Sequence, residues 1–246
     1  MIRRAAFVTS GLTALGFAAC GRQVTPNPVL NSNLAGRMVI TFGTNGPMDF
    51  TNFNYVVVFN TSGTGGEPYP NAYATSFLNY SYAWAIGASY GTALPVLIQY
   101  VLTPGNNNQL NPIQVHYNPP EVALVLNYNG AGSEFQFTFV RTLLYDPLGV
   151  GPSPSPSPSA APNATPTPAV TLPPNFSTTW YINFFTIDKY NNVQDSLGIG
   201  GATDTSFSFS CDITQNFMDP IFRQTGANLP ANAAAQISGG EIDNYL

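Results

Sequence analysis

Residues 134–145 read Glu-Phe-Gln-Phe-Thr-Phe-Val-Arg-Thr-Leu-Leu-Tyr, and apolar and polar side chains alternate along this stretch. Because successive side chains of a β-strand point to opposite faces of its sheet, the alternation predicts a strand with one buried face. The predicted buried face consists of Phe135, Phe137, Phe139, Leu143 and Tyr145. The predicted polar face consists of Glu134, Gln136, Thr138 and Thr142. Since an apolar sheet face needs a second layer to cover it, the stretch indicates a layered β-protein.

Similar stretches recur at short intervals and are separated by turn-forming residues such as Asn45-Gly46-Pro47 and Asn129-Gly130. The predicted strands are 37–43, 53–60, 76–87, 95–102, 112–117, 121–128, 134–145, 178–187 and 205–213. Helix formers are scarce, and only residues 231–236 favour a helical turn. The chain is therefore predicted to be all-β, an antiparallel two-sheet β-sandwich of the immunoglobulin-like or jelly-roll-like kind, with a Gly-, Asn- and Ala-rich tail.

The composition excludes several classes of partner. Charged residues make up 8% of the chain, against about 25% in an average soluble protein. Beyond residue 19 the basic residues are Arg22, Arg37, Arg141, Lys189 and Arg223. These few cations cannot neutralise a run of phosphates, which excludes nucleic acid as a partner. For the same reason, electrostatic binding to anionic lipid is excluded. With 44% hydrophobic residues the chain can still fill a core.

The N-terminus has the composition of an export signal. Arg3 and Arg4 precede a largely apolar stretch of 15 residues, 5–19, which is shorter than the about 20 residues that span a bilayer. Small residues at positions 18 and 19 then lead to Cys20. The sequence therefore predicts a signal peptide at residues 1–19 that is removed before Cys20.

The segment Phe17-Ala18-Ala19-Cys20 resembles the lipobox of bacterial lipoproteins, with Phe17 in place of the usual Leu. The resemblance covers about the first 21 residues. It implies that Cys20 is acylated, that the partner is a lipid bilayer and that the protein lies in the cell envelope on the extracytoplasmic side. Gly21 and Arg22 follow without an Asp, which favours the outer membrane in a double-membrane cell. In a single-membrane cell the anchor lies in the outer face of the plasma membrane. The alternative is an ordinary secretory signal with an incidental Cys20.

Two segments differ in composition from the predicted strands: one precedes all of them, and the other, rich in Pro and Ser, interrupts them between 134–145 and 178–187. Residues 20–35 form a polar tether, and residues 149–175 are rich in Pro, Ser and Thr and favour extended, disordered conformations. The second segment either links two domains or is a loop within one, and it is also a candidate for O-glycosylation. The 71 residues after it are few for a separate domain, so we favour a single β-domain over 36–246.

Two groups of residues are weak candidates for binding sites. Tyr80, Tyr82 and Trp84 share one face of a predicted strand and could stack against sugar rings, although the small residues on the opposite face favour a stripe that points into the core. Asp188, Asn191 and Asp195 place oxygen atoms around one turn, as a calcium ion requires. Lys189 opposes a cation there, so an ordinary hairpin turn is the favoured alternative.

The remaining reactive side chains indicate no catalytic motif. Alternation places Cys211 among Phe209 and Ile213, which predicts a buried, inert thiol, and His116 is the sole histidine, at the end of a predicted strand. One histidine excludes a multi-histidine zinc site, and no Gly-x-Ser-x-Gly motif occurs. Carboxylates for a glycoside hydrolase are available at Glu67, Glu121, Glu134, Asp146, Asp188, Asp195, Asp204, Asp212 and Asp219.

We therefore expect a membrane-anchored lipoprotein without a cofactor and with a non-enzymatic binding or structural role in the cell envelope. The partner beside the bilayer is then a polysaccharide or another envelope protein. Two alternatives remain: a carbohydrate-binding surface lipoprotein that uses Tyr80, Tyr82 and Trp84, and, less favoured, a glycoside hydrolase-type envelope enzyme.

Overall fold

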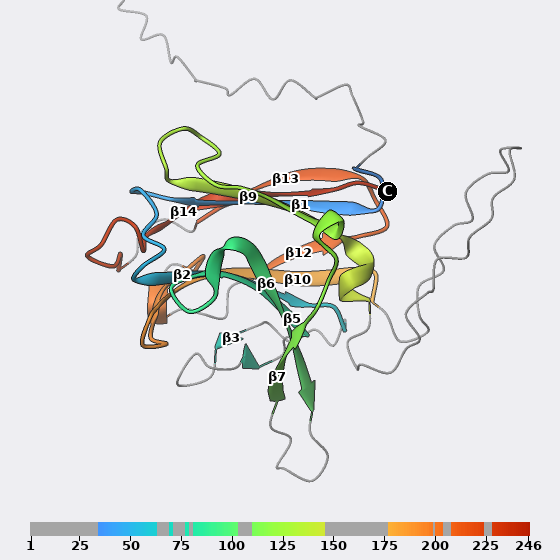
Figure 1. Ribbon diagram of the computed structural model, residues 1–246, viewed down its shortest axis with the longest axis horizontal. Coiled ribbons are helices and arrows are strands. Elements are labelled where there is room, and N and C mark those ends of the chain that lie inside the picture. The colour runs from blue at the N-terminus through green and yellow to red at the C-terminus, as the bar shows by residue number, and fades with distance from the viewer. Residues whose placement is uncertain are drawn as a thin grey trace, which may run out of the picture.

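The computed structural model describes residues 34–62, 69–70, 77–78, 81–102, 110–145, 177–198, 200–203, 208–223 and 228–246. Within these ranges, antiparallel strands form two large sheets that pack face to face (Figure 1). The prediction of an all-β, two-sheet sandwich is confirmed. The predicted signal peptide, Cys20, Tyr80 and the tract at 149–175 lie outside the described residues.

The first sheet, here sheet A, is built from strands on both sides of the proline-rich tract. Its strands are β1 (Arg37–Thr44), β8 (Val122–Val125), β9 (Glu134–Val140), β13 (Phe217–Phe222) and β14 (Ile237–Asn244). They lie in the order β13-β14-β1-β9-β8. Ile40 of β1 lies opposite Phe137 of β9 on one side and opposite Ile242 of β14 on the other. All three side chains are buried, so this row faces the second sheet.

The second sheet, sheet B, contains the longest strand of the described chain. Its strands are β2 (Phe53–Asn60), β5 (Tyr82–Gly87), β6 (Gly91–Leu102), β7 (Leu110–Val115), β10 (Thr179–Asp188), β11 (Val193–Ser196) and β12 (Phe209–Asp212). They lie in the order β11-β10-β2-β5-β6-β7, and β12 pairs with the other half of β10. Because β10 lies beside β2 and β14 lies beside β1, the segments before and after the tract share both sheets.

The remaining elements are short. They are the hairpin of β3 (Tyr69–Pro70) and β4 (Phe77–Leu78) and the 3₁₀ helices η2 (Pro119–Glu121), η3 (Arg141–Leu144) and η4 (Gly201–Thr203). The single strand predicted over 76–87 is wrong, because β4 pairs with β3 whereas β5 pairs with β2.

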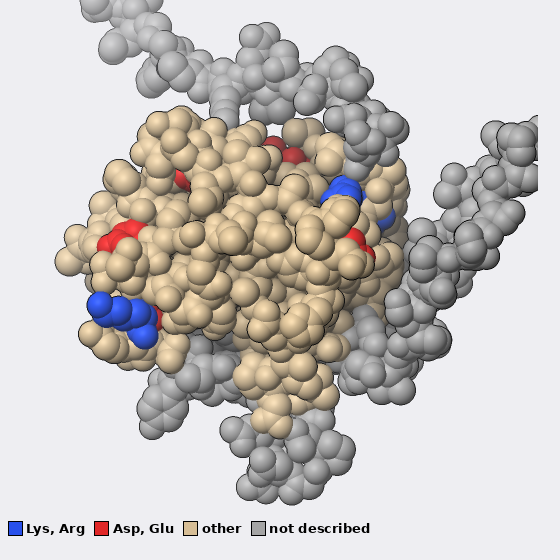
Figure 2. Space-filling model, in the orientation of Figure 1, with Lys and Arg blue, Asp and Glu red and all other residues tan. Residues whose placement is uncertain are grey.

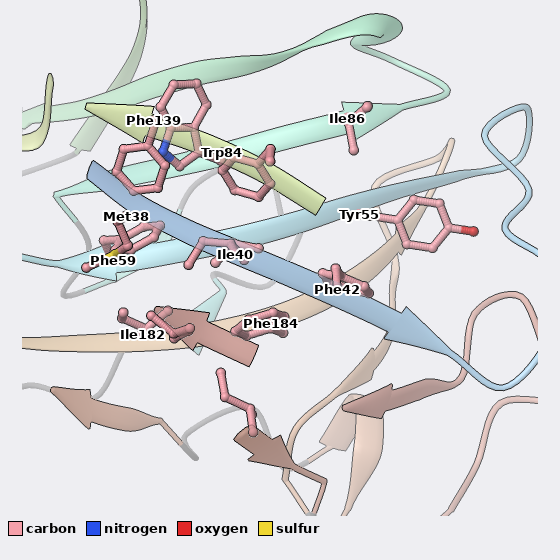
Figure 3. Packing of buried hydrophobic residues seen from close by; sticks show 14 of the residues in the cluster. Met38, Ile40, Phe42, Tyr55, Phe59, Trp84, Ile86, Phe139, Ile182 and Phe184 are labelled. Carbon is pink, nitrogen blue, oxygen red and sulfur yellow. The ribbon is translucent and has the colours of Figure 1, made fainter. Parts of the chain in front are cut away.

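Aromatic side chains dominate the core between the sheets. Phe135, Phe137 and Phe139 of β9 are buried there, as their alternation predicted. The ring of Phe42 stacks on Phe135 at 5.4 Å and lies 5.2 Å from the ring of Phe184, so contacts cross from sheet A to sheet B (Figure 3). Each fully buried Phe stabilises the fold by about 1.5–3 kcal/mol relative to an exposed one.

The predicted strand over 134–145 ends early. After Val140 the chain turns into η3, and Arg141 is buried with its Nη1 donating to the carbonyl oxygen of Ile213 at 2.7 Å. The helical turn brings Leu144, rather than Leu143, fully into the core. A buried guanidinium needs hydrogen-bond acceptors, and the carbonyl oxygen of Ile213 provides one for Arg141.

The predicted Gly-, Asn- and Ala-rich tail is instead part of sheet A. It forms β13 and β14, and β14 lies inside the sheet between β13 and β1. A Cβ added to Gly240 would lie 2.2 Å from the carbonyl oxygen of Thr41 on β1 and 3.2 Å from Phe184. The glycine therefore allows the backbones and the core to approach closely, although glycine lowers the strand propensity of the sequence. Residues 231–236, before β14, form turns, with Ala235 N donating to Asn232 O at 2.9 Å.

Charged side chains are sparse on the folded surface. Figure 2 shows a few isolated Lys, Arg, Asp and Glu side chains on a face that consists mainly of other residues. This distribution agrees with the 8% charged residues of the chain. Contacts with a partner on this face therefore depend on neutral polar and apolar side chains.

Candidate functional site

The face of sheet B that points away from sheet A also carries apolar side chains. They alternate with the residues of the core between the sheets along β2, β5, β6 and β10. This outer cluster consists of Val56, Val58, Ala83, Ala85, Ile98, Tyr100, Phe185 and Ile187. All of these side chains are buried, so the outer cluster is a second apolar core on this face of sheet B.

A groove of about 420 Å³ lies over one end of the outer cluster. Its floor consists of Val56, Val96, Ile98, Tyr100 and Ile187. Its rim carries Asn54, Ser89, Tyr90, Gln114 and Asn191. We call this feature the outer groove. Its volume falls in the range of small-molecule sites, and an apolar floor with a few polar side chains is their usual composition.

Asn54 fixes one wall of the outer groove. Its side chain is buried, Nδ2 donates to Ser89 Oγ at 3.1 Å, and Oδ1 accepts from the Ser89 backbone N–H at 2.8 Å. The turn between β5 and β6 is thereby held against β2. Because Tyr90 follows Ser89 directly, the same pair of hydrogen bonds sets the position of the Tyr90 backbone.

Two tyrosines contribute aromatic surface to the groove. Tyr90 is 37% exposed, whereas Tyr100 is buried in the floor. Burial raises the pKa of both hydroxyls above the ordinary tyrosine value, and the nearby Tyr90 raises the pKa of Tyr100 further. Both groups are therefore neutral at physiological pH, and Tyr90 presents an exposed ring face together with its hydroxyl.

Gln114 and Asn191 supply amide groups from opposite sides of the groove. Both residues are exposed, and neither side chain donates to or accepts from another described residue. Asn191 has a φ of +67° in the turn after β10, and Asp188 Oδ1 holds that turn by accepting the backbone N–H of Tyr190 at 2.8 Å. The two amides can therefore hydrogen-bond a ligand without breaking a bond within the described chain.

The described lining of the outer groove is electrically neutral. None of its described lining residues is Lys, Arg, Asp, Glu or His. A charged ligand placed there would lose hydration without gaining an opposite charge. The groove therefore suits an uncharged ligand with both apolar and hydrogen-bonding surface.

The predicted aromatic stripe does not provide a binding surface at two of its three positions. Tyr82 and Trp84 are each 1% exposed and belong to the core between the sheets. The Trp84 ring lies 5.2 Å from Phe139 and 5.5 Å from Tyr117. Both residues therefore point into the core, as the favoured alternative predicted, and the sugar-stacking role is not retained for them; they alternate with Ala83 and Ala85, which face the outer side. Tyr80 lies outside the described residues.

The predicted metal ligands are not brought together. Asp188 is on the surface and accepts from the side chains of Asn192 and Gln194, whereas Asp195 is fully buried and pairs with Arg223. The Asp188 carboxylate accepts hydrogen bonds from amides, and the Asp195 carboxylate pairs with a guanidinium. The turn at Asp188, Asn191 and Asp195 is therefore an ordinary hairpin turn, as the favoured alternative predicted. Among the described residues, no group of three or more His, Cys, Asp and Glu side chains could hold a metal ion.

A pair of carboxylates that is not among the predicted candidates lies on the outer face of sheet A. Glu241 and Asp243 alternate with the buried Ile242 on β14 and lie opposite Thr41 and Val39 of β1. Burial of Asp243, the charge of Glu241 and a hydrogen bond with it raise the pKa of Asp243 to about 7. Their period-two spacing is visible in the sequence, but it lies in the segment that is predicted to be a tail.

Two further predictions concern single side chains. Cys211 is a free, buried thiol, as its position in the alternation predicted, and burial raises its pKa to about 12. His116 is exposed and follows the end of β7. Neither residue lies in the outer groove.

Comparisons with protein-family models, with curated proteins and with solved structures each found no match to this chain. No helix in the described part of the chain has the length and apolar character needed to cross a membrane.

Proposed function

We propose that the chain is a lipid-anchored, non-enzymatic binding protein of the cell envelope that holds its ligand in the outer groove. The observation that carries the binding role is the composition of that groove: an apolar floor, a rim of neutral polar side chains and two amides with no partner among the described residues. The anchor rests on the lipobox-like residues 17–20.

The surroundings of the groove favour binding over catalysis. Acid–base catalysis needs a titratable group within hydrogen-bond reach of the substrate, and the described lining offers only two tyrosines with raised pKa values. Glu241 and Asp243, the carboxylate pair that a hydrolase could use, belong to sheet A, whereas the groove lies on sheet B. A glycoside hydrolase is therefore the weaker proposal.

The anchor is tested by metabolic labelling with an alkyne-tagged palmitate in a bacterial host. The chain offers a matched control, because Cys211 is the only other cysteine. We expect label on the wild type and on the Cys211→Ser variant, and none on Cys20→Ser. Label that persists in Cys20→Ser, or its absence from the wild type, contradicts the anchor.

The binding role is tested by sedimentation of the fragment 21–246 with purified bacterial cell envelopes. Val96→Lys places a cation on the floor of the groove, while Ile113→Lys places one on the opposite face of the neighbouring strand, where Ile113 is 50% exposed. We expect Val96→Lys to reduce the sedimented fraction and Ile113→Lys to leave it unchanged. Equal sedimentation of both variants and the wild type would show that the groove is not the binding site.

A further inference from the structure

We infer that the ligand of the outer groove is a neutral saccharide. This inference rests on the proposed binding role of the groove and narrows it to one chemical class. It follows from three properties of the described lining residues: the absence of charge among them, an accessible tyrosine ring, and amides around an apolar floor.

The charge of the groove selects among ligands. A nucleotide, a phospholipid headgroup or an acidic polysaccharide needs cations, and the described lining contains no Lys or Arg. The nearest basic side chain along the chain from Asn191 is Lys189, whose Nζ donates to Asn52 Oδ1 at 3.1 Å. The Lys189 ammonium group is thus hydrogen-bonded to a surface amide. Neutral hexose units carry no charge that would be left without a partner.

The two faces of a pyranose ring match the floor and the rim. Sugar C–H groups are apolar and pack on aromatic rings, and Tyr90 presents such a ring at the rim with 37% of its surface exposed. Val96 and Ile98 extend the apolar surface from Tyr90 along β6. The C–H face of a sugar ring can therefore be buried against this apolar surface without losing a hydrogen bond to water.

The hydroxyl groups of a sugar match the amides. An amide side chain offers both a donor and an acceptor, which suits two adjacent hydroxyls that each donate and accept. No described residue hydrogen-bonds the side-chain amide of Gln114 or Asn191, so each amide can both donate to and accept from a sugar hydroxyl. Asn54 and Ser89 are instead bonded to each other and hold the wall in place before the ligand arrives. Such preorganisation reduces the entropic cost of binding.

A proline-rich peptide is the main competing occupant, since such peptides also bind aromatic-lined grooves. It is disfavoured because those grooves present several accessible aromatic rings. Here Tyr100 is only 4% exposed, which leaves Tyr90 as the accessible ring of the described lining.

The envelope sedimentation of fragment 21–246 distinguishes the two occupants. Periodate cleaves the vicinal diols of sugars, whereas protease digestion removes peptides. We expect binding to survive protease and to be lost after periodate. Binding that survives periodate and is lost after protease overturns the saccharide while the groove remains a binding site. Sedimentation that Val96→Lys does not reduce overturns the binding role itself.

A direct measurement uses an array of neutral and uronic acid-containing glycans, followed by titration calorimetry with the strongest neutral glycan. We expect Tyr90→Ala to weaken binding by about tenfold, in line with the worth of an aromatic contact. Tyr190→Ala is the matched control, because Tyr190 is 74% exposed and does not line the groove. Gln114→Ala and Asn191→Ala should each weaken binding by about fivefold to tenfold. A preference for acidic glycans, no glycan binding, or equal effects of Tyr90→Ala and Tyr190→Ala would overturn the inference.

Discussion

Asp195 of β11 and Arg223, the residue after β13, form an ion pair between the two sheets, with Oδ2 and Nη1 2.5 Å apart. Asp195 is fully buried, and its Oδ2 also accepts the backbone N–H of Ile237 at the start of β14 at 2.8 Å. Burial raises the pKa of Asp195, although the N–H of Ile237 and the charge of Arg223 act in the opposite direction. The pair therefore connects an edge of sheet B with β13 and β14 of sheet A.

Removal of one partner of this pair should destabilise the protein strongly. Arg223→Met leaves a buried carboxylate without its cation, which we expect to lower the free energy of unfolding by about 3–5 kcal/mol. Urea unfolding followed by circular dichroism measures this change. The double variant Asp195→Leu/Arg223→Met should recover part of the loss, because no unpaired charge remains, although the backbone N–H of Ile237 loses its acceptor. A single variant as stable as the wild type would show that the pair does not support the junction of the sheets.

Gly240 should tolerate no side chain. The Cβ of Gly240→Ala would lie 2.2 Å from Thr41 O, so β14 and β1 must separate, and we expect a loss of about 2–3 kcal/mol or more. The control is Ser238→Ala, two residues earlier on β14 at an exposed position. Thermal unfolding of the two variants tests the prediction. Equal melting temperatures would contradict the close packing of β14 against β1.

The stability of the fold should depend on the protonation of Asp243. Its pKa is about 7 in the folded chain and about 3.8 without the surroundings of the fold, so the folded state holds the proton more tightly. The contribution of Asp243 to the free energy of unfolding is therefore greatest below about pH 4. It is lost as the pH rises through about 7. The charged and titratable groups that act on Asp243 are Glu241, Asp219 and Tyr245.

Asp243→Asn should remove this part of the pH dependence, because an amide cannot ionise. We expect the variant to be more stable than the wild type at pH 8 and similar at pH 4, as measured by urea unfolding at both values. Asp212→Asn is the control, since hydrogen bonds from Thr214 lower the pKa of that carboxyl, which has the opposite linkage. An unchanged slope in Asp243→Asn would exclude Asp243 as its source.

Cys211 should be unreactive in the folded protein. Its pKa is raised to about 12 by burial first and by Asp219 and Asp212 next, so little thiolate forms at pH 8. In the fragment 21–246, which lacks Cys20, we expect Ellman's reagent to label the thiol only after denaturant is added. Rapid labelling of the native fragment would contradict the burial of this strand.

Strands with regular alternation, and strands with a run of β-branched and aromatic residues such as β2 and β10, were predictable from the sequence, while the glycine-interrupted β14 was not. β9 was found because Phe135, Phe137 and Phe139 alternate with polar residues. β14 was missed because Gly239 and Gly240 interrupt its pattern, and the reason for a glycine at 240 lies on another strand.

The candidate site was the harder part to predict. The sequence drew attention to Tyr82 and Trp84, and a row of aromatic residues does not reveal whether it faces solvent or a second sheet. Tyr90 and Gln114 carry no local motif, so no sequence signal pointed to the groove that contains them. The alternation of Val96, Ile98 and Tyr100 on β6 was a usable signal, because it gives that strand an outer apolar face.

The sequence by itself determined the all-β class, the low charge and most of the strands, because period-two alternation and turn residues act between neighbours along the chain. Only the tertiary structure decided that sheet B is apolar on both faces and that Asn54, Gln114 and Asn191 meet at one groove. These residues are brought together by strand order and register, which depend on packing between segments far apart in the sequence.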